Sequence, residues 1–319
     1  MSFSGEVKEE LSRQWNRARH CQIAELSAII SMCGNVIFDS RNQMRLKIQT
    51  ENLSVARKCF TLIQKGFNIR TDVAVRYNCE KGSISYLVAV GNPRDASRII
   101  QAVKLKGTDG EIREELSIVR NIVIQNACCK RAFLRGAFLA GGSMSDPHKA
   151  YHLEIVCASE KKAEQIQQIM KSFEMDAKIV KRKKVYVVYL KEGTQIVDAL
   201  NIMEAHVALM EFENVRILKE MRNTVNRKVN CETANINKTV SAAVKQLEDI
   251  KYIQNTIGFE KLSDGLRETA IARLGHPDAT LKELGALLTP PVGKSGINHR
   301  LRKLSEIAGK VRESKEVLL

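Results

Sequence analysis

One stretch constrains the fold more than any other: residues 133–143 read FLRGAFLAGGS. Its apolar residues predict a helix, and Gly136 and Ala137 leave one face of that helix almost bare. A bare face lets the backbone of a second helix approach closely, so the stretch predicts a tightly packed helix pair. The paired Gly141 and Gly142 are expected to end the helix with a positive φ, after which a strand begins.

A similar stretch, residues 26–34, lies about 108 residues earlier. It is also apolar, carries small residues on one face and ends in a glycine, Gly34. Two such helices in one chain predict an internal duplication, with the helices paired about a pseudo-twofold axis. The rest of the chain up to residue 204 supports this prediction, because helix, two strands, helix, two strands and helix follow in the same order twice.

The elements of the two halves are predicted from apolar periodicity and from cap and turn residues. A capped helix that starts near Ser4 comes first. The first half is expected to contain helix 20–33, strands 34–39 and 44–50, a helix from the N-cap Asn52 to Lys65 closed by Gly66, strands 73–77 and 83–90, and a helix from Asn92 to about Lys106. The second half is expected to contain helix 128–140, strands 142–144 and 151–157, a helix capped by Ser159 that runs to about Ser172, strands 176–181 and 184–190, and helix 193–203.

The remainder of the chain is predicted to be helical throughout. The expected helices are 205–226, 234–256, 264–274, 281–288 with Thr280 as cap, and 295–310. A short apolar helix, a turn that contains glycine and a second helix with basic and amide side chains near its start are typical of a helix-turn-helix. The fold class is therefore α+β: a duplicated domain of two αββαββα halves, followed by an all-α helix-turn-helix domain.

The expected domain boundaries follow from this order of elements. They are an N-terminal helix in 1–19, the two halves in 20–110 and 111–204, a linker helix in 205–229, and a DNA-binding domain in 230–319 with its helix-turn-helix at about 279–312.

The charge balance favours a polyanionic partner. The net charge is +15, and residues 1–229 supply most of it, with 37 basic and 25 acidic side chains against 14 and 11 in residues 230–319. A basic protein gains affinity for nucleic acid by releasing counterions, although charge alone leaves the partner open.

The chain has no run of about 18 apolar residues and no apolar N-terminal targeting segment. A cytoplasmic location without a membrane partner is therefore expected.

No metal, cofactor or catalytic site is predicted. The eight cysteines include no Cys-x-x-Cys spacing, and they are interpreted as reduced thiols that act as small hydrophobes. Gly293, Lys294 and Ser295 match the end of a nucleotide-binding P-loop, but Leu288 stands where that motif needs a glycine.

The second helix of the predicted helix-turn-helix carries the candidate DNA contacts. They are Lys294, Ser295, Asn298, His299, Arg300, Arg302 and Lys303, with the apolar Ile297, Leu301, Leu304 and Ile307 on the buried side. Arginine can bond a guanine edge twice and asparagine an adenine edge, while either can bind phosphate instead. A solvated basic helix in an interaction domain is the alternative. Secondary phosphate contacts are predicted at Lys181, Arg182, Lys183, Lys184, Arg227 and Lys228.

The two glycine-terminated helices resemble the LAGLIDADG motif of homing endonucleases. In that family the acidic residue before each final glycine binds a divalent metal ion and supports DNA cleavage. The matching positions here are Cys33 and Gly141, and neither is a carboxylate. A thiol and a hydrogen cannot supply the hard oxygen ligands that two-metal cleavage needs. The resemblance therefore implies the fold and argues against nuclease activity.

Nearly the whole chain resembles the WhiA family of bacterial regulators. The segments that carry the resemblance are 2–11, 133–143, 223–235, 280–284 and 294–304. It implies a degenerate homing-endonuclease domain joined to a C-terminal helix-turn-helix, with roles in cell division, chromosome segregation and, in spore formers, sporulation.

The leading hypothesis is a non-catalytic transcription regulator that binds double-stranded DNA at the nucleoid. Its duplicated domain would offer a sheet surface, lined by strands such as 44–50 and 184–190, to DNA or to a protein partner such as another regulator or a sigma factor. The alternatives are an active LAGLIDADG-type endonuclease and an architectural nucleoid protein with little sequence preference.

Overall fold

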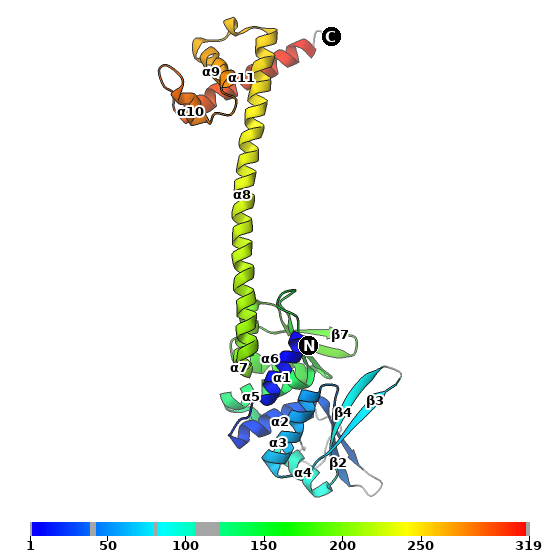
Figure 1. Ribbon diagram of the computed structural model, residues 1–319. Coiled ribbons are helices and arrows are strands. Elements are labelled where there is room, and N and C mark those ends of the chain that lie inside the picture. Colours follow the sequence, from blue (N-terminus) through cyan, green and yellow to red (C-terminus); the bar gives the residue numbers. More distant parts are fainter. Residues whose placement is uncertain (1, 39–42, 80–81, 106–120, 317–319) are drawn as a thin grey trace. The chain divides into compact units, whose positions relative to one another are not determined.

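The computed structural model describes residues 2–38, 43–79, 82–105 and 121–316. The chain divides into two compact units, Met1–Glu220 (unit 1) and Met221–Leu319 (unit 2) (Figure 1). Each unit has its own cluster of buried apolar side chains, so the chain folds around two separate cores. Among the described residues, no helix has the length and apolar character needed to cross a membrane.

Unit 1 contains two halves with the same order of elements. The first half consists of α2 (Arg19–Cys33), β1 (Gly34–Phe38), β2 (Met44–Thr50), α3 (Leu53–Phe67), β3 (Asp72–Asn78), β4 (Ser83–Val90) and α4 (Pro93–Ala102). The second consists of α5 (Ala127–Gly141), β5 (Gly142–Met144), β6 (Leu153–Cys157), α6 (Glu160–Lys171), β7 (Lys178–Arg182), β8 (Val185–Leu190) and α7 (Gly193–Met203). The antiparallel sheets have equivalent strand orders, β1-β2-β4-β3 and β5-β6-β8-β7, which confirms the predicted duplication.

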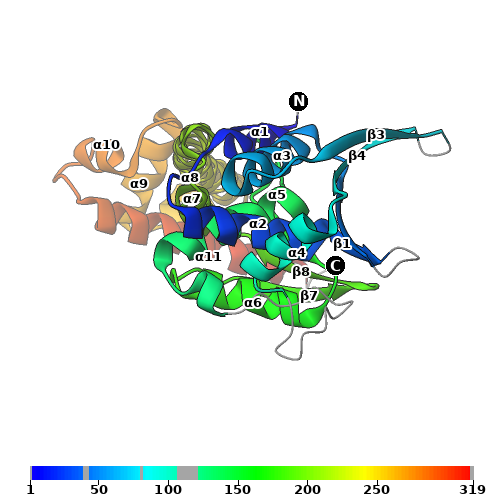
Figure 2. The ribbon, with the colours of Figure 1, turned by 90° about the horizontal axis from the view of Figure 1, so that it is seen from below.

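The helices α2 and α5 form the centre of unit 1 and lie side by side (Figure 2). Gly136 permits their close approach, because a Cβ atom there would lie only 2.4 Å from the carbonyl oxygen of Glu25. Gly141 has a similar role, since its Cβ atom would lie 2.6 Å from Cε of Met32. The small residues therefore serve helix packing, as their pattern predicted.

The positive φ predicted for Gly141 and Gly142 at the end of α5 is wrong. Gly34 and Gly142 follow α2 and α5 with φ values of −90° and −81°, and both have extended backbone. The chain passes directly from helix to strand at these points. A Cβ atom at Gly142 would lie 2.5 Å from the carbonyl oxygen of Phe138, so glycine is needed there for space.

A buried network of charges crosses the α2–α5 interface. The guanidinium of Arg135 in α5 donates from Nε to Glu25 Oε1 in α2 at 3.1 Å and from Nη1 to Glu204 Oε2 at 2.6 Å. Lys58 Nζ in α3 lies 3.0 Å from the same Glu25 oxygen. The side chains of Glu25, Lys58 and Arg135 are at most 1% exposed. One carboxylate therefore compensates two cations at the junction of the two halves.

Several predicted boundaries in unit 1 need correction. Helix α3 continues through Gly66 and ends before Asn68, whose φ of 56° supplies the left-handed C-cap. Helix α4 ends at Ala102 and not near residue 106, which lies outside the described residues, as does the predicted boundary at 110/111. Strand β6 begins at Leu153. The first helix, α1 (Phe3–Arg13), starts near Ser4 as predicted and is capped by Ser2, whereas the Ser159 side chain makes no cap hydrogen bond.

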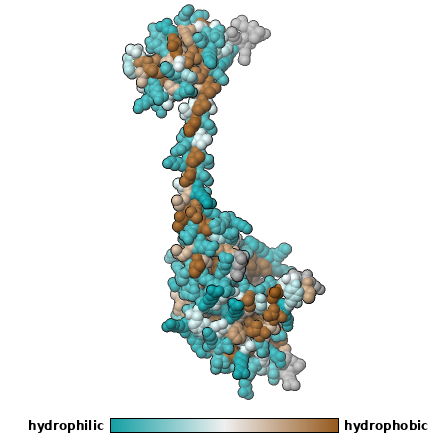
Figure 3. All heavy atoms as spheres, in the orientation of Figure 1, coloured by the Kyte–Doolittle hydropathy of each residue, from teal (hydrophilic) through white to brown (hydrophobic). Residues whose placement is uncertain are grey.

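The predicted helices 205–226 and 234–256 are one helix, α8 (His206–Thr256). No glycine or proline occurs between them, so nothing in the sequence interrupts the helical hydrogen bonds. The predicted boundary at 229/230 therefore falls inside a helix. Side chains from Met221 to Val240 are exposed, and several of them are apolar (Figure 3).

Unit 2 continues with η2 (Phe259–Lys261), α9 (Asp264–Gly275), α10 (Leu281–Ala286) and α11 (Lys294–Glu316). Its core contains Ile250 and Ile253 from α8, Leu266 and Ala270 from α9, Leu284 from α10, and Ile297, Leu301 and Leu304 from α11. These helices confirm the predicted all-helical domain.

Candidate nucleic-acid interface

The helices α10 and α11 form the helix-turn-helix. Thr280 and Glu283 build a capping box: Thr280 N donates to Glu283 Oε2 at 2.8 Å, and Glu283 N donates to Thr280 Oγ1 at 3.3 Å. The turn folds back onto α10, where Val292 N donates to the carbonyl oxygen of Gly285 at 2.9 Å. A Cβ atom at Gly285 would lie 2.0 Å from the carbonyl oxygen of Val292, so only glycine fits here. These contacts set the position of α11.

Helix α11 has one buried and one exposed face. Ile297, Leu301 and Leu304 are at most 1% exposed, and Ile307 is half-buried, as predicted. The exposed side chains are Lys294, Ser295, Asn298, His299, Arg302 and Lys303. Residues 295, 299 and 302 follow one another at i+4 and i+3 spacing over about two turns, on the side opposite the buried residues. Six of the seven candidate DNA contacts therefore share an accessible surface, which we call the α11 face.

Arg300 differs from the other six candidates. It is half-buried, and its Nη1 donates to the carbonyl oxygen of Gly265 at 3.2 Å and lies 3.5 Å from Thr269 Oγ1. Both partners belong to α9. The side chain thus fastens α11 to α9 and does not point from the α11 face. Its position on the helix allowed the side chain to point either to solvent or toward α9, and only the packing of α9 against α11 shows which direction it takes.

An ion pair also holds α11 within unit 2. Arg312 Nη1 lies 2.9 Å from Asp249 Oδ1 in α8, and its guanidinium stacks 4.8 Å from the ring centroid of Tyr252. The Asp249 side chain is only 2% exposed, so this pair is shielded from solvent on one side. The sequence offered no local signal for it, because the partners lie far apart along the chain.

The predicted phosphate contacts in unit 1 lie at the β7–β8 hairpin. Lys181, Arg182, Lys183 and Lys184 are all exposed. Arg182 Nη1 is paired with Glu154 Oε2 at 3.0 Å, and Lys181 Nζ lies 5.4 Å from the Tyr186 ring centroid. Lys183 has a φ of 54° and forms part of the turn. Two members of the cluster are therefore already engaged within the sheet. The other two predicted contacts, Arg227 and Lys228, are exposed on α8.

The ends of α2 and α5 correspond to the catalytic centre of the nuclease fold. Cys33 Sγ donates to the carbonyl oxygen of Ile29 at 3.2 Å, and burial raises the pKa of this thiol to about 12 despite the opposing effect of Lys8 and Lys162. A pocket of about 710 Å³ borders Cys33, and Glu51 is the one acidic residue among its lining residues. Across the described parts of the chain, no group of three or more His, Cys, Asp or Glu side chains converges there. The donor set does not match that of a two-metal nuclease.

The fold and these sites define a LAGLIDADG-like protein with altered catalytic positions and an appended helix-turn-helix domain. Three family models match the chain: the WhiA N-terminal LAGLIDADG-like domain at residues 19–106, the WhiA LAGLIDADG-like domain at 130–222 and the WhiA C-terminal HTH domain at 225–308. The chain therefore belongs to the WhiA family.

Relatives support this assignment over the full length. A protein of Lachnoclostridium phytofermentans named "Probable cell division protein WhiA" is 57% identical, over 98% of this chain and 100% of its own. A protein of the same name from Alkaliphilus oremlandii is 50% identical, over 99% of both chains. The crystal structure of full-length DUF199/WhiA from Thermotoga maritima matches with a TM-score of 0.58 and 24% identity, over 97% of this chain and 99% of that one. At that identity the structure supports the fold alone.

Proposed function

We propose that this chain is a non-catalytic DNA-binding protein that regulates transcription in cell division and chromosome segregation and, in spore formers, sporulation. The observation that carries the proposal is the α11 face, where six polar or basic side chains stand exposed on the second helix of a helix-turn-helix. Such helices enter the major groove with their N-terminal residues against the base edges. The name shared by the relatives, "Probable cell division protein WhiA", supports the cellular role.

The α11 face divides by chemistry into base contacts and phosphate contacts. The Asn298 amide has the donor and acceptor that read an adenine edge, Arg302 has the paired donors that read a guanine edge, and His299 lies beside them on the same face. Lys294, Ser295 and the N-terminus of α11 suit phosphate, as does Lys303 at the side of the face. We assign Arg300 to positioning α11 against α9, because its donors are directed to Gly265 and Thr269.

Unit 1 would add a second, weaker contact. Its sheets and the exposed Lys183 and Lys184 would meet DNA phosphates, with Arg227 and Lys228 of unit 2 as further phosphate contacts, or the sheets would bind a protein partner such as a sigma factor or another regulator. A duplex-binding protein of this kind would act at the nucleoid, in the cytoplasm.

The proposed lack of nuclease activity rests on Cys33 and Gly141. A half-buried neutral thiol and a glycine replace the acids that would hold two metal ions, and Glu51 alone cannot replace both. Incubation of supercoiled DNA with the full-length protein and Mg²⁺ or Mn²⁺ is expected to leave the DNA intact. Metal-dependent cleavage that Glu51→Gln abolishes would overturn this part of the proposal.

Sequence-specific binding is tested on the α11 face itself. Asn298→Ala and Arg302→Ala are each expected to weaken binding to a selected site by about 1–3 kcal/mol, roughly 5- to 150-fold, with little change on unrelated DNA. Lys303→Ala is expected to weaken binding to all sequences alike and to reduce the salt slope by about 1. Lys251→Ala is the matched control, since Lys251 is exposed on α8 and outside the α11 face.

The measurement is a titration of fluorescent duplexes at several salt concentrations, with sites first identified by genome-wide footprinting. Equal losses on specific and unrelated DNA for Asn298→Ala and Arg302→Ala would refute the proposed base contacts. Broad protection without discrete sites would favour the architectural alternative.

A further inference from the structure

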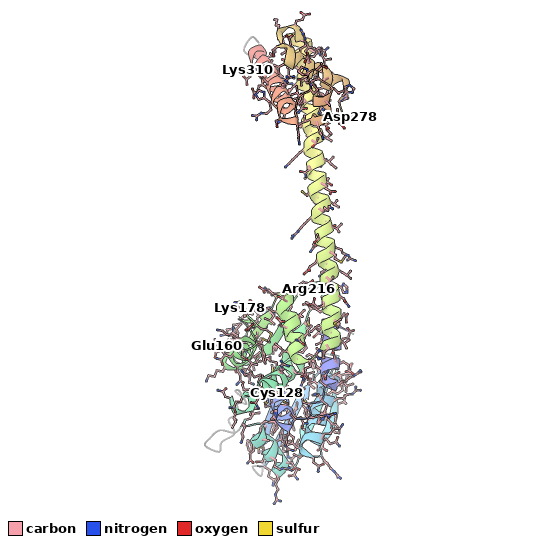
Figure 4. All side chains as sticks on the ribbon, turned by 90° about the vertical axis from the view of Figure 1, so that its left-hand side faces the viewer. Cys128, Glu160, Lys178, Arg216, Asp278 and Lys310 are labelled. Carbon is pink, nitrogen blue, oxygen red and sulfur yellow. The ribbon has the colours of Figure 1, made fainter. Side chains whose placement is uncertain are left out.

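Four metal-ligating side chains from two distant segments meet at the N-terminal ends of the central helices. They are His20 and Cys21 in α2 and Cys128 and Cys129 in α5, and their ligand atoms all lie within 4.8 Å of one another. His20 Nδ1 lies 3.1 Å from Cys129 Sγ and 3.3 Å from Cys21 Sγ. Cys128 is labelled in Figure 4, where it lies among the ribbons of unit 1. No other group of three or more such side chains converges in the described residues.

The four positions are related by the internal duplication. His20 and Cys21 are the second and third residues of α2, and Cys128 and Cys129 are the second and third residues of α5. Each pair therefore occupies the first turn of its helix, at the end opposite to Cys33 and Gly141. Because the helices pair about a pseudo-twofold axis, equivalent positions face one another there. This symmetry explains how residues about 108 positions apart can form one cluster.

We propose that His20, Cys21, Cys128 and Cys129 bind one zinc ion that fastens α2 to α5. Three thiolates and one imidazole form a Cys3His set, which is a standard tetrahedral zinc site. A single zinc ion with bonds of about 2.3 Å to sulfur places its ligand atoms roughly 3.8 Å apart, a separation that the cluster reaches with small side-chain shifts. On binding, the three thiols release their protons to solvent, and His20 coordinates as the neutral imidazole through Nδ1.

The helix dipoles favour thiolate ligands, although burial raises the pKa of the Cys21 and Cys129 thiols without metal. All three cysteines lie in the first turn of a helix, where the aligned peptide dipoles favour negative charge. The zinc–thiolate centre would carry one net negative charge, and two helix N-termini are directed at it. Hard cations such as Mg²⁺ and Ca²⁺ prefer oxygen ligands, and an iron–sulfur cluster would need its ligands farther apart than 4.8 Å to surround several irons.

The site would be structural. All four positions of a tetrahedral ion are filled by protein, so no position remains for substrate or activated water. Cys21 and Cys129 are each 3% exposed, whereas His20 and Cys128 reach the surface, which leaves a path for the metal ion. The small residues Gly136 and Gly141 hold the helices together along their length, and the zinc ion would hold them at their N-terminal ends.

The direct test is the metal content of the full-length protein. After zinc reconstitution and gel filtration, elemental analysis is expected to find about one zinc ion per chain in the wild type and less than about a tenth of that in Cys128→Ser. Cys128 is exposed, so the substitution alters little packing. Cys231→Ser is the matched control, since Cys231 is also exposed and lies outside the cluster, and it is expected to keep its zinc.

Two measurements on the wild type keep the test independent of variant folding. Replacement of zinc by Co²⁺ is expected to produce thiolate-to-cobalt charge-transfer bands and the intense visible bands of a tetrahedral site. Bound zinc is also expected to protect Cys21, Cys128 and Cys129 from alkylation until a chelator removes it, and removal is expected to lower Tm. Absence of zinc after reconstitution, full zinc retention in Cys128→Ser, or a disulfide between Cys21 and either α5 cysteine would overturn the proposal.

Discussion

The substitution Glu25→Gln tests the buried charge network of unit 1. It removes the carboxylate that lies 3.0 Å from Lys58 Nζ and 3.1 Å from Arg135 Nε, while it keeps the shape of the side chain. Arg135 would then keep Glu204, whose side chain is 34% exposed, as its carboxylate partner. Lys58, which is 1% exposed, would keep only its hydrogen bond to the carbonyl oxygen of Gln14. Loss of one partner from a buried ion pair costs about 3–5 kcal/mol, because an uncompensated charge stays behind.

Lys58 can relieve part of this cost and Arg135 cannot. Burial already lowers the pKa of Lys58, with Glu25 as the main opposing influence, so the substitution lowers that pKa further. The lysine can then lose its proton, whereas an arginine stays charged. A lysine with a lowered pKa in the folded state binds fewer protons there than in the unfolded state. The free energy of unfolding of the variant therefore increases as pH rises from the folded pKa of Lys58 to its unfolded pKa. The deficit of Glu25→Gln is therefore expected to be smaller at pH 9 than at pH 7.

Urea denaturation followed by tryptophan fluorescence measures this effect in the appropriate unit. Trp15 is the sole tryptophan and belongs to unit 1, so its signal reports that unit even if unit 2 unfolds separately. A loss of about 3–5 kcal/mol corresponds to a Tm lower by roughly 6–20 °C for a unit of this size. Glu9→Gln is the control: Glu9 pairs with the exposed Arg13 at 2.9 Å and accepts a hydrogen bond from Ser54 that a glutamine can also accept, so loss of its charge is expected to cost at most about 1 kcal/mol.

A double variant separates charge from packing. Adding Lys58→Met to Glu25→Gln removes one of the two uncompensated cations and is expected to recover part of the lost stability. Two results would contradict a stabilising role for this buried charge network. One is a free-energy loss for Glu25→Gln no larger than that for Glu9→Gln. The other is a double variant whose loss equals the sum of the losses of Glu25→Gln and Lys58→Met measured singly.

Three further predictions concern unit 2. Gly285→Ala is expected to destabilise the helix-turn-helix by about 1–3 kcal/mol, because the new Cβ atom would lie 2.0 Å from the Val292 oxygen. Gly309→Ala in α11 meets nothing within 4 Å and is expected to stabilise the domain by roughly 0.5–1 kcal/mol. Circular dichroism melts in which both variants change Tm in the same direction would contradict this. The hydrogen bonds that Glu283 accepts from Thr280 lower the pKa of Glu283 below 4.5. Its capping contribution to stability is therefore complete above that pH and is lost as pH falls through the pKa of the folded state. The stability difference between wild type and Glu283→Gln is expected to vanish in acid, and a difference that stays constant with pH would refute the capping role of the Glu283 carboxylate. Removal of residues 230–319 is expected to abolish site selection in footprinting, and a fragment 1–229 that still selects the same sites would disprove the proposed division of labour.

Much of the fold could be predicted because it depends on local patterns. The bare face around Gly136 indicated the helix pair, repeated element order indicated the duplication, and Thr280 marked the start of α10. Predictions failed where two local signals compete. Gly66 lies inside α3 and Asn68 ends the helix, since either residue can adopt a left-handed backbone. The two helices predicted over 205–256 are one helix, α8, because no glycine or proline separates them.

The candidate site was predictable only in part. The residues of the α11 face follow from helical periodicity, since a buried stripe at Ile297, Leu301 and Leu304 places the polar residues outside. The direction of Arg300 does not follow, because a long side chain at the edge of a helix can turn either way. Its contact with Gly265 depends on where α9 packs.

The sequence by itself determined the duplicated domain and the helix-turn-helix, because composition and spacing within a few turns of chain carry that information. The resemblance to the LAGLIDADG motif is what marked Cys33 and Gly141 as positions without the family's acids. Only the tertiary structure decided that Arg135 is buried beside Glu25 and that His20 and Cys21 meet Cys128 and Cys129. Those contacts join positions about 110 residues apart, and they exist because two helices related by the duplication pack against each other. No local spacing in either segment encodes that packing.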